Sequence, residues 1–492
     1  MITDLVDAAK LPITECDVCI LGAGPAGIST ALELARLRPD WQIALLEGGG
    51  RNMPASAELD PYAGESVGSP AYPLAGSRLR YLGGTSNHWG GWCRPLDAED
   101  FEARSWIPHS GWPLTRDDLL PWYKKAAVWC EIASNEYSEA ALSPSLGGAI
   151  LPVDDSQMLC NKYFRFSPPT RFGTRYRADL DAASNLHLLL HANATGLTFS
   201  NQRVTSVQVA IPSGTTGTLK ARQVVVALGG IETTRFLLMH AVRAPHGSGL
   251  ASPMLGRCFA DHFGVTPAVA LLPEKLGYNR NQHPTGALMP VLSLTRAAQE
   301  SLRVPDFCVT PVPDPQSSDL QPVYAENQTF GLHPGRYWKY RLQMILEPQP
   351  NPDSRITLID QVDAFGMKRI HLDWKISEAD LKSCVECLDD LGAELGLFGL
   401  GRLRILSESE YMGGMPGVGF HHMGSARMAG DVEGGVVDAD CRVHGMENLH
   451  VASSAVFPSF GFSNPTLTIV ALATKLAAHL AQSASPSPVG LH

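Results

Sequence analysis

Residues 16–50 read CDVCILGAGPAGISTALELARLRPDWQIALLEGGG, and this stretch decides the fold of the chain. The apolar run before Gly22 has the composition of a strand buried on both faces, whereas Ile28 to Leu37 follows helical periodicity. A second apolar run then ends at the acidic residue Glu47. This order of strand, glycine turn, helix, strand and acidic residue predicts a βαβ unit, and hence an α/β fold.

The turn between strand and helix has the spacing GxGxxG, with glycines at 22, 24 and 27. The first glycine permits a tight turn, the second lets a pyrophosphate approach the backbone, and the third lets the helix pack close to the strand. Glu47, about 20 residues after the last glycine, is placed to accept hydrogen bonds from ribose hydroxyls. The unit predicts a dinucleotide site formed by Gly22, Gly24, Pro25, Ala26, Gly27, Glu47 and Gly48.

The fingerprint alone does not distinguish NAD from FAD, although the Glu47 carboxylate would repel the 2′-phosphate of NADP. A single fingerprint near the start of a 492-residue chain favours FAD. The segment 222–235, RQVVVALGGIETTR, is typical of another buried strand that ends in Gly-Gly before a helix. A strand that returns to the first sheet in this way is what a split flavin-binding domain needs. A plain NAD dehydrogenase is the rival, and everything after residue 80 disfavours it.

Between Thr266 and about Glu410 the pattern of apolar and polar residues changes. Short alternating segments such as FCVTPVP and KRIHLDW are separated by Pro, Asn and Asp turns, which predicts an antiparallel sheet, followed by a helix over residues 378–397. We expect an FAD-binding domain in residues 1–265, a substrate-binding domain in 266–411, a return to the FAD-binding domain in 412–484, and a flexible tail in 485–492.

Composition excludes several classes of function. With 44% hydrophobic and 18% charged residues, the chain has the profile of a globular protein with a large core. The formal net charge is −10 and no Lys/Arg cluster stands out, so neither a nucleic-acid face nor an anionic-membrane anchor is expected. No apolar stretch reaches the ~20 residues of a membrane span, and the N-terminus has no signal-peptide pattern, so we expect a cytoplasmic protein.

The ten cysteines suit a reducing compartment and predict no metal site. Cys16 and Cys19 lie in a predicted strand, where positions i and i+3 face opposite sides. Cys384 and Cys387 lie in a predicted helix, where they share one face as small core residues.

Two further segments are specific. Residues 83–95 read GGTSNHWGGWCRP, and residues 420–480 contain FHHMGSARMAG and SNPTLTIVALATKLAAHL. With the fingerprint, VVVALGGIETTR, LGRCFADH and PNPDSRITL, they resemble the glucose–methanol–choline (GMC) family of FAD-dependent alcohol oxidoreductases along nearly the whole chain. His-Trp after the GG turn, HxMG and NPTLT are most similar to the branch of pyranose oxidases and sugar (C-glycoside) 3-oxidases. The sequence Trp89-Gly90-Gly91 stands where the family often has Asn-Gly, which removes the analogy with choline or aryl-alcohol oxidases there.

The resemblance implies a GMC-type two-domain fold, with a Rossmann-like FAD-binding domain and a substrate domain built on an antiparallel sheet. It implies oxidation of a secondary alcohol, a ring hydroxyl of a sugar or glycoside, to a ketone. It also implies further cofactor-binding residues: Gly84, Thr85, Asn87, His88, Trp89, Gly90, Gly91, Ala194, Ala227, Ser454, Asn464, Pro465 and Thr466.

Oxidising a CH–OH group requires a base for the hydroxyl proton while a hydride goes to flavin N5, and a neutral imidazole suits the first task. By resemblance to the HxMG and NPTLT motifs, His421 is that base and Asn464 is its partner at the substrate oxygen. His422 is the nearest competitor. Asp261 and His262 fall in a family-typical backbone segment, and we expect structural roles for them.

Asn464 and Pro465 also predict a helix start, because Asn is a good N-cap and Pro is favoured at the first helical position. We expect the positive end of this helix against the flavin pyrimidine edge.

His88 is similar to the histidine that is bonded covalently to the flavin in fungal pyranose oxidases. Many relatives with HWGG hold FAD without such a bond, and we expect non-covalent FAD, with a covalent link at His88 as the alternative. Also left open are a non-sugar alcohol (sterol, aryl or aliphatic) as substrate, a lyase reaction, the electron acceptor (oxygen, a quinone or a partner protein) and a homo-oligomer.

Overall fold

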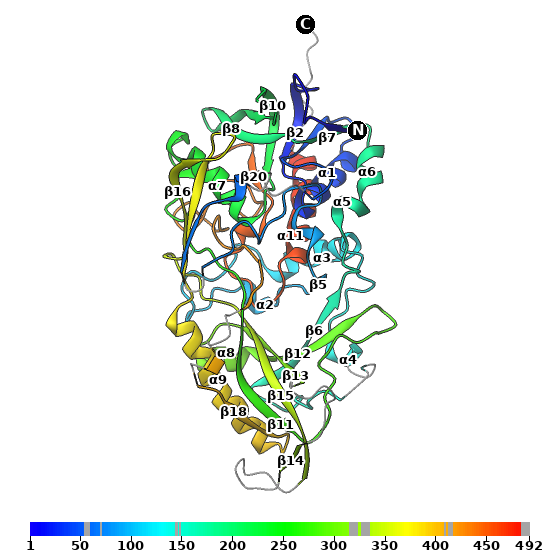
Figure 1. The fold of residues 1–492 in the computed structure, drawn as a ribbon, viewed down its shortest axis with the longest axis vertical. Coiled ribbons are helices and arrows are strands. Elements are labelled where there is room, and N and C mark those ends of the chain that lie inside the picture. The colour runs from blue at the N-terminus through cyan, green and yellow to red at the C-terminus, as the bar shows by residue number, and fades with distance from the viewer. Residues whose placement is uncertain are drawn as a thin grey trace.

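The computed structural model describes residues 1–53, 60–68, 71–142, 146, 149–313, 323–325, 335–407, 410–411 and 417–483. The predicted tail, residues 485–492, lies outside the described residues. Figure 1 shows an upper part built around one sheet and a lower part built around another, stacked along the long axis of the molecule.

The upper sheet contains the predicted βαβ unit. Its order in space is β1 (Ile2–Asp4), β7 (Leu186–Leu190), β3 (Ile43–Glu47), β2 (Glu15–Leu21), β10 (Thr216–Val226), β9 (Arg203–Ala210) and β8 (Asn193–Ser200), with β20 (Leu449–Val451) also on β10. The strands β1, β7, β3, β2, β10 and β20 pair in parallel, whereas β10, β9 and β8 pair antiparallel. The α/β class predicted from the sequence is confirmed.

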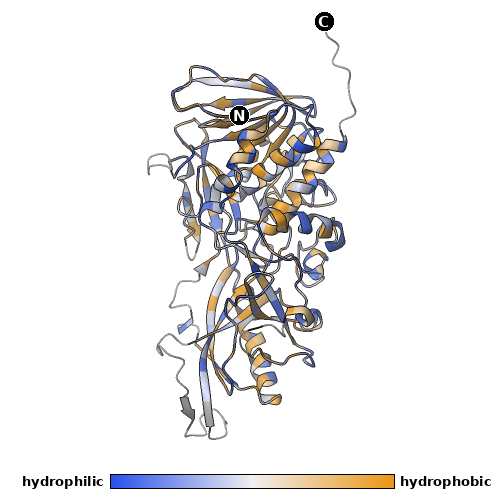
Figure 2. Cartoon of the chain, turned by 90° about the vertical axis from the view of Figure 1, so that its right-hand side faces the viewer, coloured by the Kyte–Doolittle hydropathy of each residue, from blue (hydrophilic) through white to orange (hydrophobic). Residues whose placement is uncertain are grey.

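Helices cover this sheet. As a consequence, β3 is buried throughout and β2 is buried along most of its length. α1 (Pro25–Leu37) packs beside α11 (Thr466–Ser483), which also contacts α3 (Arg116–Trp129). Apolar residues cover much of the helices that pack here (Figure 2). α1 begins three residues before the predicted Ile28, because Pro25 occupies the first helical position after Gly24.

The returning strand is β10, which runs parallel to β2 with Val224 opposite Cys19. It leads through Gly229 into α7 (Gly230–His240), in the predicted order of strand, Gly-Gly and helix.

The lower sheet is antiparallel, as predicted. Its order is β18 (Arg402–Ile405), β11 (Phe263–Leu272), β15 (Gly335–Leu346), β13 (Phe307–Pro313), β12 (Leu288–Leu294), β6 (Leu159–Phe166) and β5 (Trp92–Cys93), with β14 (Val323–Ala325) on β15 and β19 (Gly417–Val418) on β11. α9 (Glu378–Leu397) matches the predicted helix and packs against β18. Its N-terminus is capped by Ser377, whose hydroxyl accepts from the N–H of Asp380.

The predicted domain boundaries differ from the strand pairing in two places. β5 and β6 join the lower sheet from within residues 1–265, whereas β16 (Arg355–Val362) and β17 (Lys368–Trp374) pair with β4 (Glu65–Gly68) and pack on α7. Alternating patterns predict strands but not their neighbours, so the division into two domains stays a prediction.

Shorter elements complete the fold: α2 (Ala98–Phe101), α4 (Glu139–Leu142), α5 (Phe172–Arg175), α6 (Arg177–Ala182), α8 (Arg296–Leu302) and the 3₁₀ helices η2 (Gly84–Asn87), η4 (Ala241–Arg243), η5 (Gly249–Ala251) and η7 (Ser454–Val456). Across the described residues, no helix combines the length and apolar character needed to cross a membrane.

A buried ion pair joins segments from both parts. Both terminal nitrogens of Arg104, just after α2, donate to the carboxylate of Glu347, just after β15, at 2.9 Å each. The two side chains are 0% and 1% exposed. Glu347 also accepts from the backbone N–H of Phe460 at 2.9 Å. Since an unpaired charge here would be costly, the pair fixes how the three segments meet.

Replacing Arg104 by methionine leaves the Glu347 charge buried without its partner, so we expect the free energy of unfolding to fall by about 3–5 kcal/mol. Arg203→Met is the matched control, because its pair with Glu447 has side chains 42% and 58% exposed. The control is expected to cost about 1 kcal/mol or less. Urea unfolding followed by tryptophan fluorescence measures the free energy of unfolding of both variants. Equal decreases would show that the buried Arg104–Glu347 pair stabilises the fold no more than an exposed pair does.

Candidate active site

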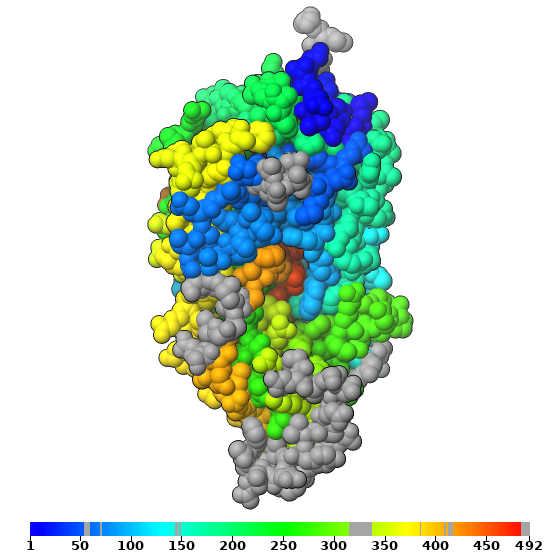
Figure 3. Space-filling model, in the orientation of Figure 1, coloured from blue at the N-terminus to red at the C-terminus, as the bar shows by residue number. Residues whose placement is uncertain are grey.

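A cavity of about 590 Å³ opens between the two parts of the molecule. Its walls come from the turn after β2, the end of β3, parts of residues 78–92, the start of α7, and the C-terminal segments 417–422 and 452–469. In Figure 3, orange and red atoms of the C-terminal region show in a hollow at mid-height, below the blue residues. The volume lies within the range of about 300–1,000 Å³ typical of small-molecule and cofactor sites.

The glycines of the first turn have different surroundings, as the fingerprint predicts. Gly22 has φ +101°, and a Cβ on it would lie 2.5 Å from the carbonyl oxygen of Ala227. A Cβ on Gly27 would lie 1.8 Å from the carbonyl oxygen of Gly22, so the helix packs close only because this residue is glycine. A Cβ on Gly24 would meet nothing within 4 Å. The backbone at Gly24 therefore faces open space that a pyrophosphate can enter.

The second glycine turn lies against the first. The N–H of Gly83 donates to the carbonyl oxygen of Ala23 at 2.8 Å. Gly84 has φ +52°, and a Cβ on it would lie 3.2 Å from Cα of Gly24. A single elongated ligand can therefore contact both turns.

Glu47 lines the cavity at the end of β3, where the sequence places it. Its carboxylate accepts from the N–H of Ala23 at 3.1 Å and from that of Gly49 at 2.9 Å. Burial raises the pKa of the Glu47 carboxyl, and these two N–H groups oppose that rise. The acceptor is held rigidly at the position expected for ribose recognition.

Most residues predicted to bind the cofactor line this cavity: Gly22, Gly24, Pro25, Ala26, Glu47, Gly48, Gly84, Thr85, His88, Trp89, Gly90, Ala194, Ala227, Ser454, Asn464, Pro465 and Thr466. Gly27, Asn87 and Gly91 lie behind its wall instead. The side-chain amide of Asn87 donates to the carbonyl oxygen of Leu82 at 3.0 Å, and the carbonyl of Gly91 accepts from Ser167. These three residues hold the turns in shape.

His421 and Asn464, the two residues predicted to act at the substrate oxygen, meet at the cavity. The amide nitrogen Nδ2 of Asn464 lies 3.1 Å from Nε2 of His421. His421 follows β19 and Asn464 precedes α11, and the His421 side chain is 18% exposed. The pair couples a polar amide to an imidazole at the cavity wall.

Asp261 holds the backbone that carries His421. Its carboxylate accepts from the N–H groups of Phe420 at 2.9 Å and His421 at 2.8 Å, and from the Tyr72 hydroxyl at 2.6 Å. Phe420 has φ +58°, an unusual conformation that these bonds maintain. Burial raises the pKa of the Asp261 carboxyl to about 7.

His262 lies directly behind His421. The two Nδ1 atoms are 2.8 Å apart, and the rings are perpendicular with centroids 5.0 Å apart. Asp261 has the structural role predicted for it, because it holds the backbone at His421, whereas His262 also contacts the His421 side chain. Sequence reasoning missed this because the two histidines are 159 positions apart.

The imidazoles in this group are neutral at pH 7. Removal from water lowers the pKa of His421 well below its ordinary value, and neighbouring His262 and His422 act in the same direction. Burial likewise lowers the pKa of His262 to about 4 and that of His422 to about 3.

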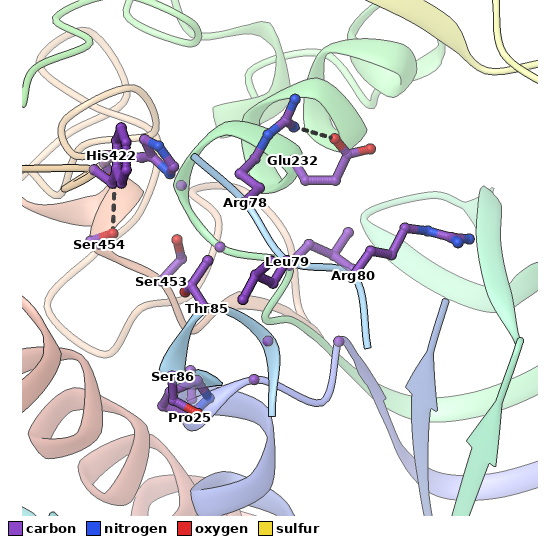
Figure 4. A pocket seen from close by; sticks show the side chains of 18 of the residues that line it. Pro25, Arg78, Leu79, Arg80, Thr85, Ser86, Glu232, His422, Ser453 and Ser454 are labelled. Carbon is purple, nitrogen blue, oxygen red and sulfur yellow. Dashed lines mark hydrogen bonds and ion pairs between the residues drawn. The ribbon is translucent and has the colours of Figure 1, made fainter. Parts of the chain in front are cut away.

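His422, the competitor of His421, is directed elsewhere. Its Nε2 lies 3.1 Å from the Ser77 hydroxyl, and its ring stands edge-on to Tyr72. Its carbonyl oxygen accepts from the Ser454 hydroxyl at 2.7 Å, as drawn in Figure 4. The geometry favours His421 over His422 as the partner of Asn464.

His88 lies at the end of η2 and lines the cavity. Its ring stacks on Phe420 at 23°, with centroids 6.2 Å apart. Its neighbour Trp89 donates from Nε1 to the carbonyl oxygen of Thr170 at 2.9 Å.

The predicted helix after Asn464 is present as α11, which begins at Thr466. The carbonyl oxygen of Pro465 accepts from the N–H of Ile469 at 2.8 Å, so Pro465 sits one place earlier than predicted. The Asn464 side chain contacts His421 through its amide nitrogen Nδ2.

Sequence reasoning missed Arg78, Arg80 and Glu232, which line the cavity wall in Figure 4. Nη1 of Arg78 lies 3.0 Å from the Glu232 carboxylate, and their side chains are 6% and 14% exposed. Arg78 and Arg80 are spaced i and i+2, which in an extended segment places both side chains on the same side. This spacing is the sequence signal that could have predicted them as residues of one site.

Three carboxylates outside the cavity, those of Asp97, Asp100 and Asp306, are close enough together to share a cation. The ammonium of Lys162 lies 2.8 Å from Asp97 and 3.7 Å from Asp306, and Arg94 pairs with Asp97 at 2.8 Å. Side-chain cations therefore already offset this cluster.

Comparison with known proteins gives several matches. The family model of GMC oxidoreductases matches residues 407–473, the segment that carries His421 and Asn464. Paromamine 6′-oxidase of Streptomyces fradiae is 24% identical over 94% of this chain and 90% of that protein. C-glycoside 3-oxidase of Microbacterium trichothecenolyticum is 34% identical over 26% of this chain and 24% of that protein. The large subunit of fructose dehydrogenase of Gluconobacter japonicus is 24% identical over 57% of this chain, and the match spans about half, 51%, of that subunit.

Among solved structures, pyridoxine 4-oxidase from Mesorbium loti superposes with a TM-score of 0.56 over 94% of this chain and 99% of that chain, at 19% identity. This likeness shows a shared fold. The cavity fits a dinucleotide because Gly24 leaves room for a pyrophosphate and Glu47 presents a fixed acceptor. The family model at residues 407–473, the relatives aligned along the chain and the shared fold show that this chain is similar to GMC oxidoreductases.

Proposed function

We propose that this enzyme oxidises a secondary alcohol, a ring hydroxyl of a sugar or glycoside, to the ketone, with His421 as the general base. The observation that supports this most is the 3.1 Å contact between Nε2 of His421 and Nδ2 of Asn464 in the cavity that both glycine turns line. An imidazole and an amide side by side are the two groups that a CH–OH oxidation needs at the substrate oxygen.

In this proposal the glycine turns and Glu47 hold FAD, which supplies the hydride acceptor. Nε2 of His421 takes the hydroxyl proton, and the Asn464 amide orients the substrate oxygen. Because burial lowers the pKa of His421, its imidazole is unprotonated at pH 7 and ready to accept that proton.

A sugar or glycoside is favoured as substrate because the names of two relatives contain fructose and C-glycoside. A non-sugar alcohol and a lyase reaction are the alternatives, and the electron acceptor is left among oxygen, a quinone and a partner protein.

A substrate panel tests the class of reaction. We expect free sugars or glycosides to bleach the visible flavin absorbance of the purified protein under anaerobic conditions, and to reduce an artificial dye. Sterol and aryl alcohols in the same panel are the comparison. Bleaching only by these non-sugar alcohols would contradict the sugar assignment, and no bleaching by any alcohol would favour the lyase.

Replacing His421 by alanine removes the base, so we expect turnover to fall by ~10²-fold or more while FAD stays bound. His422→Ala is the control and should lower turnover much less, because its ring contacts Ser77 and Tyr72. Steady-state kinetics measures the turnover of both variants, and the flavin spectrum checks that each still binds FAD. A reversed order of the two effects would assign the base to His422.

For the flavin linkage, we expect acid precipitation to leave a yellow supernatant, because His88 is stacked on Phe420 and we propose non-covalent FAD. Colour that stays in the pellet, and is lost from it in His88→Ala, would instead demonstrate a histidyl bond. In either case His88→Ala should slow flavin reduction, since the turn loses a packing residue at the cavity wall.

A further inference from the structure

We propose that His262 is a positioning residue that holds His421 in the tautomer with its proton on Nδ1, leaving the Nε2 lone pair directed at Asn464 and the cavity. This inference rests on the proposed role of His421 as base. It adds a residue at the cavity wall whose proposed effect on the reaction passes through His421.

The argument begins at Gly461. Nε2 of His262 lies 2.7 Å from the Gly461 carbonyl oxygen. A carbonyl oxygen can only accept, so this nitrogen of His262 must carry a proton. The carbonyl is held in place because the N–H of the preceding Phe460 donates to Glu347, the partner of Arg104 in the buried ion pair.

His262 has one other ring nitrogen. In a neutral imidazole the second nitrogen has a lone pair and accepts. Burial keeps His262 neutral at pH 7, since its pKa is lowered to about 4. Its Nδ1 is therefore the acceptor in the 2.8 Å contact, and Nδ1 of His421 is the donor.

The third step concerns the far side of His421. With its single proton on Nδ1, neutral His421 has a lone pair on Nε2, and Nδ2 of Asn464 donates toward it at 3.1 Å. Asp261 does not compete for the Nδ1 proton, because its nearer oxygen is 4.0 Å from Nδ1 and accepts the His421 backbone N–H instead.

On the Nδ1 side this arrangement needs no rearrangement during proton transfer, whereas the Asn464 amide must give up the Nε2 lone pair to the substrate hydroxyl. When the substrate O–H bond breaks and an N–H bond forms at Nε2, Nδ1 keeps its proton and its bond to His262. A neutral acceptor also adds no negative charge behind the base, in keeping with the lowered pKa of His421.

Leucine and asparagine at position 262 form a matched pair, since they have the same branched skeleton and differ in the presence of an acceptor. In His262→Leu we expect His421 to lose the Nδ1–H tautomer preference and kcat to fall roughly 10-fold or more, a part of the ~10²–10⁴ that a general base supplies. In His262→Asn the side-chain oxygen replaces Nδ1 as the acceptor. We therefore expect the Nδ1–H tautomer of His421 and kcat to be largely restored.

The direct readout is the ¹⁵N NMR spectrum of the FAD-loaded, oxidised enzyme labelled at histidine, with the His421 signals assigned by their loss in His421→Asn. In the wild-type enzyme we expect a protonated Nδ1 and an unprotonated Nε2. The opposite tautomer would overturn the proposal, as would an unchanged tautomer and rate in His262→Leu. If His262→Leu fails to fold, the wild-type spectrum alone decides. Full activity of His421→Ala would refute the proposed base but leave the tautomer measurement standing.

Discussion

The parallel pairing of β10 with β2 on one side and β20 on the other is the constraint on which the rest of the site depends. Val224 lies opposite Cys19 in β2 and opposite Leu449 in β20, so one strand joins three distant parts of the chain. Because β2 leads into the first glycine turn and β20 into the segment before α11, the cofactor turn and Asn464 are placed on the same edge of the sheet.

A second pairing brings His421 to this edge. Phe263 at the start of β11 pairs with Val418 in β19, and Ala260 forms a bridge with Met423. Between these two contacts lie Asp261 and His262 on one segment and His421 on the other. The segments at the start of the lower sheet therefore hold His421, the segment before α11 supplies its amide partner Asn464, and the two side chains lie where the two parts meet.

Burial determines the protonation and charge pairing of the side chains where the two parts of the molecule meet. Loss of water keeps His262 and His421 neutral, the buried Arg104 and Glu347 charges pair with each other, and hydrogen bonds hold the buried Asp261 carboxyl. A neutral imidazole can accept a proton, whereas an unpaired buried charge would cost several kcal/mol. The same desolvation therefore affects both the stability of this region and the protonation state of His421.

The sequence by itself determined the elements whose signals are local. GxGxxG with Glu47 predicted β2, α1 and β3, the RQVVVALGG segment predicted β10, and capping and periodicity predicted α9, because each depends on residues only a few positions apart. Motif similarity singled out His421 and Asn464, whose side chains are in contact, and their catalytic roles stay a prediction. Only the tertiary structure decided that β16 and β17 leave the lower sheet, that the Asn464 amide contacts His421, and that His262 stands behind His421. These outcomes depend on which distant strands pair, and side-chain patterning specifies the face that a strand buries but not the neighbour it joins.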